Sequence, residues 1–125
     1  MDIEALHATT IRNYLHGAFN ETDIDAFKAA FHPEFAIINI LEDGSMAHFT
    51  RSMWECALKK RLEDNDFDPL SAALTARLRT VDWVGDKACA TLDLLCGERV
   101  VYTDFLLLAK IAGVWQIVSK IYHQH

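Results

Sequence analysis

The chain has 125 residues, of which 51% are hydrophobic and 24% charged, and this composition predicts one globular domain spanning residues 1–125. The formal net charge is −6, and the lysines and arginines form no basic stripe, which argues against binding to nucleic acids or anionic membrane surfaces. The chain has three cysteines without a C-x-x-C spacing, which predicts free thiols in a reducing, cytoplasmic environment. Its acidic start argues against a signal peptide, and its apolar runs are too short to predict a membrane span.

A long amphipathic helix is predicted at the beginning of the chain. Its apolar stripe recurs at intervals of three and four residues and consists of Ile3, Leu6, Ile11, Tyr14, Leu15 and Ala18. After a break at residues 20–21, Thr22 or Asp23 is expected to cap a second, short helix. Pro33 predicts the end of this helix, because a proline pushes the preceding residue, His32, out of the helical region.

A hairpin and a third helix are predicted next. The apolar, β-branched segment 35–41 is typical of a strand, and Asp43-Gly44 is typical of a tight turn that leads into a short strand over residues 46–49. Thr50 or Ser52 is then expected to cap the third helix. The apolar face of that helix consists of Met53, Trp54, Ala57, Leu58 and Leu62.

The second half of the chain changes character after a polar loop over residues 64–70. Four strand-like segments follow, at residues 74–84, 87–96, 100–111 and 114–122, and short turn signals separate them. Helices first and long sequential strands afterwards predict an α+β fold. In this fold, three helices from the N-terminal half pack on a strongly curved, mostly antiparallel sheet.

This order of elements resembles the nuclear transport factor two-like superfamily, and within it the SnoaL-like and "putative lumazine-binding" groups. The residues that carry the resemblance are Phe31-His32-Pro33-Glu34-Phe35, Asp43-Gly44, Asp104-Phe105-Leu106 and the segment Gly113–Lys120. The resemblance covers nearly the whole chain and implies a cone-shaped, cystatin-like fold. Isomerases, dehydratases, cyclases, hydrolases and non-catalytic binders share this scaffold, so the fold alone does not specify an activity.

The last two strands supply the most informative candidate site. If Ala112-Gly113 is a two-residue turn, Asp104 lies opposite Ile121 and Tyr102 lies opposite His123. Alternation along the strands then places on one face Tyr102, Asp104, Leu106, Leu108, Trp115, Ile117, Ser119, Ile121 and His123. A mostly apolar face with a few polar groups is typical of a ligand pocket, and Trp54 is expected to form one of its walls. The predicted ligand-binding residues are therefore Trp54, Tyr102, Leu106, Ser119, Ile121 and His123.

Three interpretations of Asp104 remain open. In an apolar pocket its carboxyl group would have a raised pKa and could act as a general base or as a protonated acid. It could instead be a structural acceptor for Tyr14, Trp54 or a backbone donor. A three-residue loop would shift the register and place Asp104 opposite Lys120, giving an ion pair.

Three other residues are candidates for acid–base or metal chemistry. Tyr14 could act with Asp104 to stabilise an oxyanion, as in the steroid isomerases of the superfamily, although the base of those enzymes has no counterpart here. His32 is expected either to stabilise a helix end or to shuttle protons at the pocket mouth. His123 and His125 face the same way, but a metal site needs a third ligand, so neither a metal nor a cofactor is predicted.

These features predict a small-molecule-binding protein whose concave pocket takes an apolar or aromatic ligand. If the protein is an enzyme, Asp104, Tyr14 and His32 would carry out cofactor-independent acid–base chemistry of an isomerase, dehydratase or cyclase type. The alternative is a non-catalytic dimerisation or interaction module with a side-chain-filled pocket. A cavity above ~300 Å³ would favour ligand binding over this alternative.

A homodimer is also expected. The run Phe105–Ala109 is apolar on both faces, whereas a strand with one face in water should alternate between apolar and polar residues. The helices can cover only one face of the sheet. The convex face is therefore the predicted dimer contact, with an apolar patch made of Phe105, Leu107, Ala109, Val118 and Tyr122.

Overall fold

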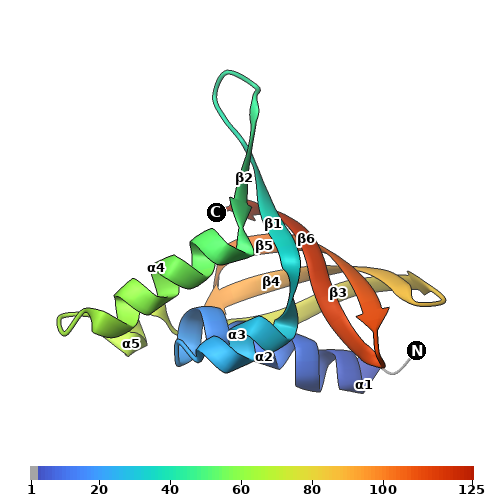
Figure 1. The fold of residues 1–125 in the computed structure, drawn as a ribbon, viewed down its shortest axis with the longest axis horizontal. Helices are drawn as coiled ribbons and strands as arrows, with labels where there is room; N and C mark the ends of the chain where they lie inside the picture. The colour runs from blue at the N-terminus through green and yellow to red at the C-terminus, as the bar shows by residue number, and fades with distance from the viewer. Residues whose placement is uncertain (1–2) are drawn as a thin grey trace.

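The computed structural model describes residues 3–125, except for the side chains of residues 8 and 70, and consists of helices packed against one face of a six-stranded sheet (Figure 1). The first two residues, which contribute to the prediction about a signal peptide, lie outside the described residues. In the part of the chain that the structure describes, no helix has both the length and the apolar character needed to cross a membrane.

The first two predicted helices form, with one difference at the end of the second. The long helix runs through four consecutive stretches: α1 (Ile3–Ala5), the π-helical η1 (Leu6–Ile11), α2 (Arg12–Leu15) and the π-helical η2 (His16–Asn20). Asp23 caps α3 (Ile24–Ala30) by accepting a hydrogen bond from the backbone of Ala26. Helix α3 ends before Pro33 is reached, because Phe31 already pairs with Ile117 of the sheet. Pro33 therefore lies within a strand.

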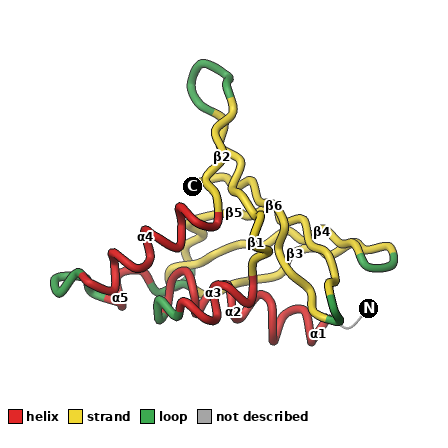
Figure 2. The backbone as a smooth tube through the Cα atoms, in the orientation of Figure 1, coloured by secondary structure: helices red, strands yellow, loops and turns green. Residues whose placement is uncertain are grey.

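Strands β1 (Phe31–Ile40) and β2 (Met46–Thr50) form an antiparallel hairpin that projects away from the rest of the molecule (Figures 1 and 2). Gly44 makes the turn possible, because its φ of +85° lies in the left-handed region that favours glycine. Thr50 then caps α4 (Arg51–Glu63) by accepting a hydrogen bond from the backbone of Met53. A short helix, α5 (Pro69–Ala72), begins within the last two residues of the predicted polar loop.

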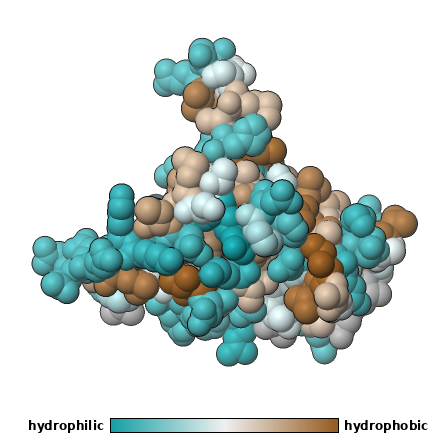
Figure 3. Space-filling view, in the orientation of Figure 1, coloured by the Kyte–Doolittle hydropathy of each residue, from teal (hydrophilic) through white to brown (hydrophobic). Residues whose placement is uncertain are grey.

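Helix α4 buries only part of its predicted apolar face, because Met53, Ala57 and Leu62 are exposed. Trp54 and Leu58 are buried, whereas Lys59, Lys60 and Glu63 are exposed. Figure 3 shows that hydrophilic side chains dominate the visible surface of this helix. The helix thus presents one face to the protein interior and the other to solvent.

The remaining strands complete a mixed but mostly antiparallel sheet. They are β3 (Thr75–Val84), β4 (Lys87–Cys96), β5 (Arg99–Ile111) and β6 (Val114–Gln124). The strand order is β2-β1-β6-β5-β4-β3, and β1 with β6 is the parallel pair. The register shifts at several points along these strands, and such bulges bend a strand and increase its twist. The predicted α+β fold on a curved sheet is therefore confirmed.

The last hairpin begins as predicted but changes register halfway along. Ile111 pairs with Val114, and the regular pairing continues as far as Leu108 with Ile117. The next pair is Leu107 with Ser119, so Val118 is the extra residue of a bulge. Beyond the bulge, the pairs are Leu106 with Lys120, Asp104 with Tyr122 and Tyr102 with Gln124. The predicted pairs Asp104–Ile121 and Tyr102–His123 are therefore wrong by one residue.

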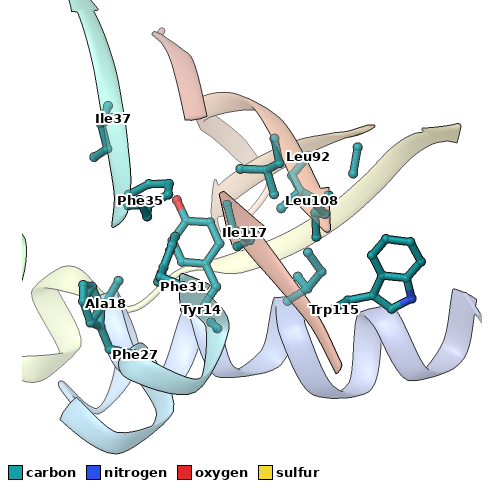
Figure 4. Close-up of a cluster of buried hydrophobic side chains, with 14 of the residues drawn as sticks. Tyr14, Ala18, Phe27, Phe31, Phe35, Ile37, Leu92, Leu108, Trp115 and Ile117 are labelled. Atoms are coloured by element: carbon teal, nitrogen blue, oxygen red, sulfur yellow. The ribbon is translucent and has the colours of Figure 1, made fainter. Parts of the chain in front are cut away.

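The core between the helices and the sheet contains a cluster of aromatic rings. Its members are Tyr14, Phe27, Phe31, Phe35 and Trp54, with neighbouring ring centroids between 4.5 and 6.1 Å apart. Figure 4 shows Tyr14 extending from its helix toward the sheet with its hydroxyl at the far end. The cluster therefore fixes the direction of a polar group that belongs to the candidate site.

Candidate functional site

A cavity of about 200 Å³ lies between the long N-terminal helix, the β1–β2 hairpin, α4 and the concave face of the sheet. Most of its wall is aromatic or aliphatic, with side chains that include Phe19, Phe49, Trp54, Leu94 and Tyr102. Tyr14, Asp104 and Lys120 also line it, and they are deeply buried. The arrangement is an apolar cavity with a few polar groups gathered at its floor, as is common for small-molecule sites.

These three side chains form a hydrogen-bonded chain that we call the polar triad. Lys120 Nζ donates a hydrogen bond to Tyr14 Oη at 2.7 Å, and the Tyr14 hydroxyl donates to Asp104 Oδ2 at 2.5 Å. Lys120 Nζ also lies 3.7 Å from the same carboxylate oxygen. The side chains of Lys120 and Asp104 are only 5% and 1% exposed, so solvent screens their interaction very little.

The fold brings the polar triad together from two distant parts of the chain. Tyr14 lies on the buried stripe of the N-terminal helix. On the sheet, Lys120 pairs with Leu106, so it lies diagonally across from Asp104 on the same face. The bulge at Val118 sets this relation, because it determines that Lys120 rather than Ser119 faces the helices.

Burial governs the protonation of the polar triad. Loss of solvation raises the pKa of Asp104 and lowers the pKa of Lys120, while the attraction between the two groups opposes both changes. Burial, followed by the charge of Asp104, raises the pKa of Tyr14 well above its usual value of 10.0. Burial thus favours the neutral form of both members of the acid–amine pair.

Asp104 has one carboxyl oxygen that is buried without a partner. Oδ2 accepts the hydrogen bond from Tyr14, whereas Oδ1 is completely buried and has no hydrogen-bond partner among the described residues. An unpaired polar atom in the interior of a protein is costly. This unpaired oxygen belongs to a residue that also lines the cavity.

The structure brings some of the predicted site residues to the cavity and not others. Tyr14, Trp54, Tyr102 and Asp104 line it. Leu106 is buried two pairs further along β5 than Asp104 and is not part of the lining. His32 lies in β1, where its Nδ1 accepts a hydrogen bond from the backbone of Glu34, and it is not part of the cavity wall.

The three predicted site residues of β6 lie elsewhere, because the bulge changes their facing. Ser119 and Ile121 line a groove on the convex side together with Phe105 and Leu107. His123 pairs with Thr103, whose side chain points away from the cavity. Their predicted position on the pocket face is therefore wrong.

Lys120 and Tyr122 take their place in the cavity wall, and sequence reasoning missed both as pocket residues. The alternative register did predict Lys120 as the partner of Asp104. In that interpretation, however, Asp104 formed an ion pair and had no role in a pocket. In the structure Asp104 faces the cavity, accepts a hydrogen bond from Tyr14 and pairs with Lys120 at the same time. The contact with Tyr14 and the contact with Lys120 therefore coexist, although the three-residue loop is wrong because Asp104 pairs with Tyr122. The acid–base role of Asp104 stays a prediction.

A second polar cluster lies on the convex face. Asp93 accepts hydrogen bonds from Arg77 at 2.7 Å and from Thr103 at 2.8 Å, and Thr103 Oγ1 lies 2.8 Å from His125 Nε2. The rings of His123 and His125 have centroids 4.9 Å apart. Within the described residues, no group of three or more histidine, cysteine, aspartate or glutamate side chains could hold a metal ion. Cys56, Cys89 and Cys96 are free and exposed.

Comparison with known families finds one match that covers almost the whole chain. The profile of a family described as "Putative lumazine-binding" matches residues 2–123. A comparison with curated proteins finds no match.

Solved structures with a similar fold come from several bacteria. An NTF2-like protein of unknown function from Shewanella baltica is 27% identical, with a TM-score of 0.72 over 100% of this chain and 97% of its own. One from Silicibacter pomeroyi is 22% identical, with a TM-score of 0.73 over 98% and 95%. An uncharacterised protein with a cystatin-like fold from Caulobacter vibrioides is 18% identical, with a TM-score of 0.61 over 98% and 89%. These likenesses identify the fold as NTF2-like and cystatin-like.

Proposed function

Since the chain belongs to the family described as "Putative lumazine-binding", we propose that it binds a small, largely apolar molecule in the cavity above the polar triad. The polar group of this molecule meets Asp104 and Lys120, and its apolar part lies against Trp54 and the other ring-bearing walls. The same triad exchanges protons with the ligand, so the activity would be acid–base chemistry that needs no cofactor.

The observation that carries this proposal is the unpaired oxygen of Asp104. Oδ1 is buried beside an apolar cavity, where a carboxyl group without a full set of hydrogen bonds is unfavourable. A ligand hydroxyl, carbonyl or ring nitrogen placed against it completes the hydrogen bonding, with the carboxyl group acting as donor or acceptor according to its protonation. Direct contact with the ligand is also the geometry that general acid–base catalysis requires.

The size of the cavity limits the ligand to about one ring. Cavities that take drug-sized ligands usually start near ~300 Å³, whereas a cavity of ~150 Å³ is enough for benzene. The volume here is about 200 Å³, which fits a single substituted ring. A lumazine has two fused rings with several hydrogen-bonding groups, so it matches this small and mainly apolar space less well. The volume is below the level that would by itself favour ligand binding over a side-chain-filled pocket, and the proposal therefore rests on the polar triad.

The test uses 4-hydroxybenzyl alcohol as a one-ring probe and follows its binding by tryptophan fluorescence and calorimetry. Replacing Asp104 by Asn keeps the size of the side chain but removes the acid and its pairing with Lys120, so we expect the same fold, a lower melting temperature and at least about tenfold weaker binding by the folded protein. Asp82→Asn is the matched control, because Asp82 is an exposed aspartate of β3. Equal affinities for wild type and Asp104→Asn would contradict the proposed role of Asp104, and a probe that binds none of the three proteins would contradict the proposed ligand class.

A further inference from the structure

Lys120 is an unusual lysine, because its amino group is enclosed by aromatic rings at the floor of the cavity. Nζ lies 4.8 Å from the centre of the Trp54 ring, 5.0 Å from that of Tyr14 and 5.3 Å from that of Tyr122. Five other lysines occur in the chain, and all of them are exposed. The environment of Lys120 therefore separates its chemistry from that of every other lysine in the protein.

The hydrogen bonds of the polar triad leave the amino group available for reaction. The direction of donation runs from Lys120 to Tyr14 and from Tyr14 to Asp104. An amine that donates one N–H bond to Tyr14 keeps its lone pair, and the lone pair makes a neutral amine a nucleophile. Burial lowers the pKa of Lys120 and increases its neutral fraction, even though the nearby rings and Asp104 attract the cation.

We propose that Lys120 is a nucleophile that condenses with the carbonyl carbon of a small aldehyde or ketone bound in the cavity and forms a Schiff base. This inference rests on the proposed function and narrows its ligand class to carbonyl compounds. The position of the amino group carries it, because Nζ is buried in the same cavity that would hold the ligand.

The polar triad supplies the electron pair and the protons that the reaction needs. The lone pair of Nζ forms the C–N bond, the electrons of the C=O double bond move to oxygen, and a proton passes from nitrogen to that oxygen. The resulting carbinolamine then loses its hydroxyl group as water, using a proton from the Asp104 carboxyl group. The products are a protonated imine, a water molecule and an Asp104 carboxylate that neutralises the new positive charge.

Reductive trapping tests the proposal directly on the wild-type protein. The probe is 4-hydroxybenzaldehyde with sodium cyanoborohydride near neutral pH, and peptide mapping by mass spectrometry locates the secondary amine. We expect modification of Lys120 to be at least about ten times faster than that of any exposed lysine, because the cavity would hold the aldehyde beside Nζ and because burial lowers the pKa of Lys120 and so increases its neutral fraction. Lys120→Met should lose the fast phase and keep the slow labelling of the exposed lysines. If Lys120 of the wild-type protein is labelled no faster than the exposed lysines, the inference is wrong. This result does not depend on whether the Lys120→Met variant folds.

The alcohol probe separates this inference from the proposed function. The compound 4-hydroxybenzyl alcohol has a similar size but no carbonyl group, so it can bind but cannot form an imine. If the alcohol binds and Lys120 is not trapped by the aldehyde, the Schiff base is excluded and the binding function stands. If the alcohol does not bind and the aldehyde is not trapped, both proposals fail. Asp104→Asn should slow trapping at Lys120 relative to Asp82→Asn, because it removes the proton donor for the loss of water.

Discussion

Buried aspartates lie on both faces of the sheet, and their surroundings shift their pKa values in opposite directions. On the concave face, burial raises the pKa of Asp104 in spite of Lys120 and Tyr14. On the convex face, the hydrogen bond from Arg77 lowers the pKa of Asp93, and Thr103 and Arg79 add to this effect. Burial therefore favours the neutral form of Asp104, whereas the contacts of Asp93 favour its charged form.

The lowered pKa of Asp93 predicts how this residue affects stability at different pH values. A carboxyl group whose folded-state pKa is depressed contributes stability above its unfolded-state value of 3.8, and this contribution is lost as the pH falls through the folded-state pKa. We expect Asp93→Asn to lower the free energy of unfolding at pH 7 by about 1 kcal/mol, because solvent screens the half-exposed arginines. Urea denaturation at pH 7 and near pH 3 measures this difference.

The control for this experiment is Asp82→Asn, which removes an exposed carboxylate from the neighbouring strand. The loss for Asp93→Asn should shrink in acid, where wild-type Asp93 also becomes protonated. A loss of the same size at both pH values would mean that charge is not what Asp93 contributes.

At the scale of elements, the position of the N-terminal helix depends on one glycine. Gly17 is buried where the long helix crosses α3, and a methyl group at this position would overlap the backbone of Phe27. Because backbone atoms cannot rotate out of the way, the two helices would have to separate. Tyr14 lies one turn away from Gly17, so this separation would also disturb the polar triad.

Gly17→Ala is therefore expected to destabilise the protein, although alanine is the better helix former. The overlap should cost about 1–3 kcal/mol, which exceeds the gain of up to about 1 kcal/mol in helix propensity. Thermal and urea denaturation measure the net loss, with Thr9→Ala at an exposed position of the same helix as the control. A more stable Gly17→Ala protein would show that the helices can move apart at little cost.

Sequence reasoning predicted the elements better than the facing of their side chains. Helical periodicity, capping residues and turn dipeptides are local signals, and they located the three main helices and the six strands. The facing of residues beyond Val118 depends on a bulge, and the run Phe105–Leu108 is apolar on both faces. Such a run carries no alternation that could reveal the register. Asp104 and Tyr14 were therefore found, while Lys120 and Tyr122 were missed as pocket residues.

At the scale of the whole molecule, the convex face of the sheet exposes a set of apolar side chains. Phe105, Leu107 and Ile121 are 49%, 54% and 43% exposed, and they line a groove of about 310 Å³. The predicted patch also contained Tyr122, but this residue lies on the concave side. The groove retains the apolar character expected of a contact between two copies of the chain.

We predict that the protein forms a homodimer through this convex face. Sedimentation at tens of micromolar should give the mass of two chains, and Leu107→Glu should reduce it to one by placing a charge in the contact. Leu62→Glu is the matched control, because Leu62 is a similarly exposed leucine on α4, at 56%. A wild-type protein that sediments as a monomer would refute the prediction, and so would equal effects of the two substitutions.

The bulge at Val118 has a consequence for how the site can change during evolution. If Val118 were deleted, Ser119 would follow Ile117 directly and the pairing with β5 would be regular. Ser119 would still face the convex side and Lys120 the concave side, because side chains alternate along a strand. If the bulge were instead removed while Val118 was kept in regular pairing, every later residue would change faces. Ser119 and Ile121 would then face the cavity in place of Lys120 and Tyr122. A cavity lined by a lysine and a cavity lined by a serine are thus separated by one step of strand pairing. In relatives that lack the extra residue, the equivalent of Lys120 is expected one position closer to the turn.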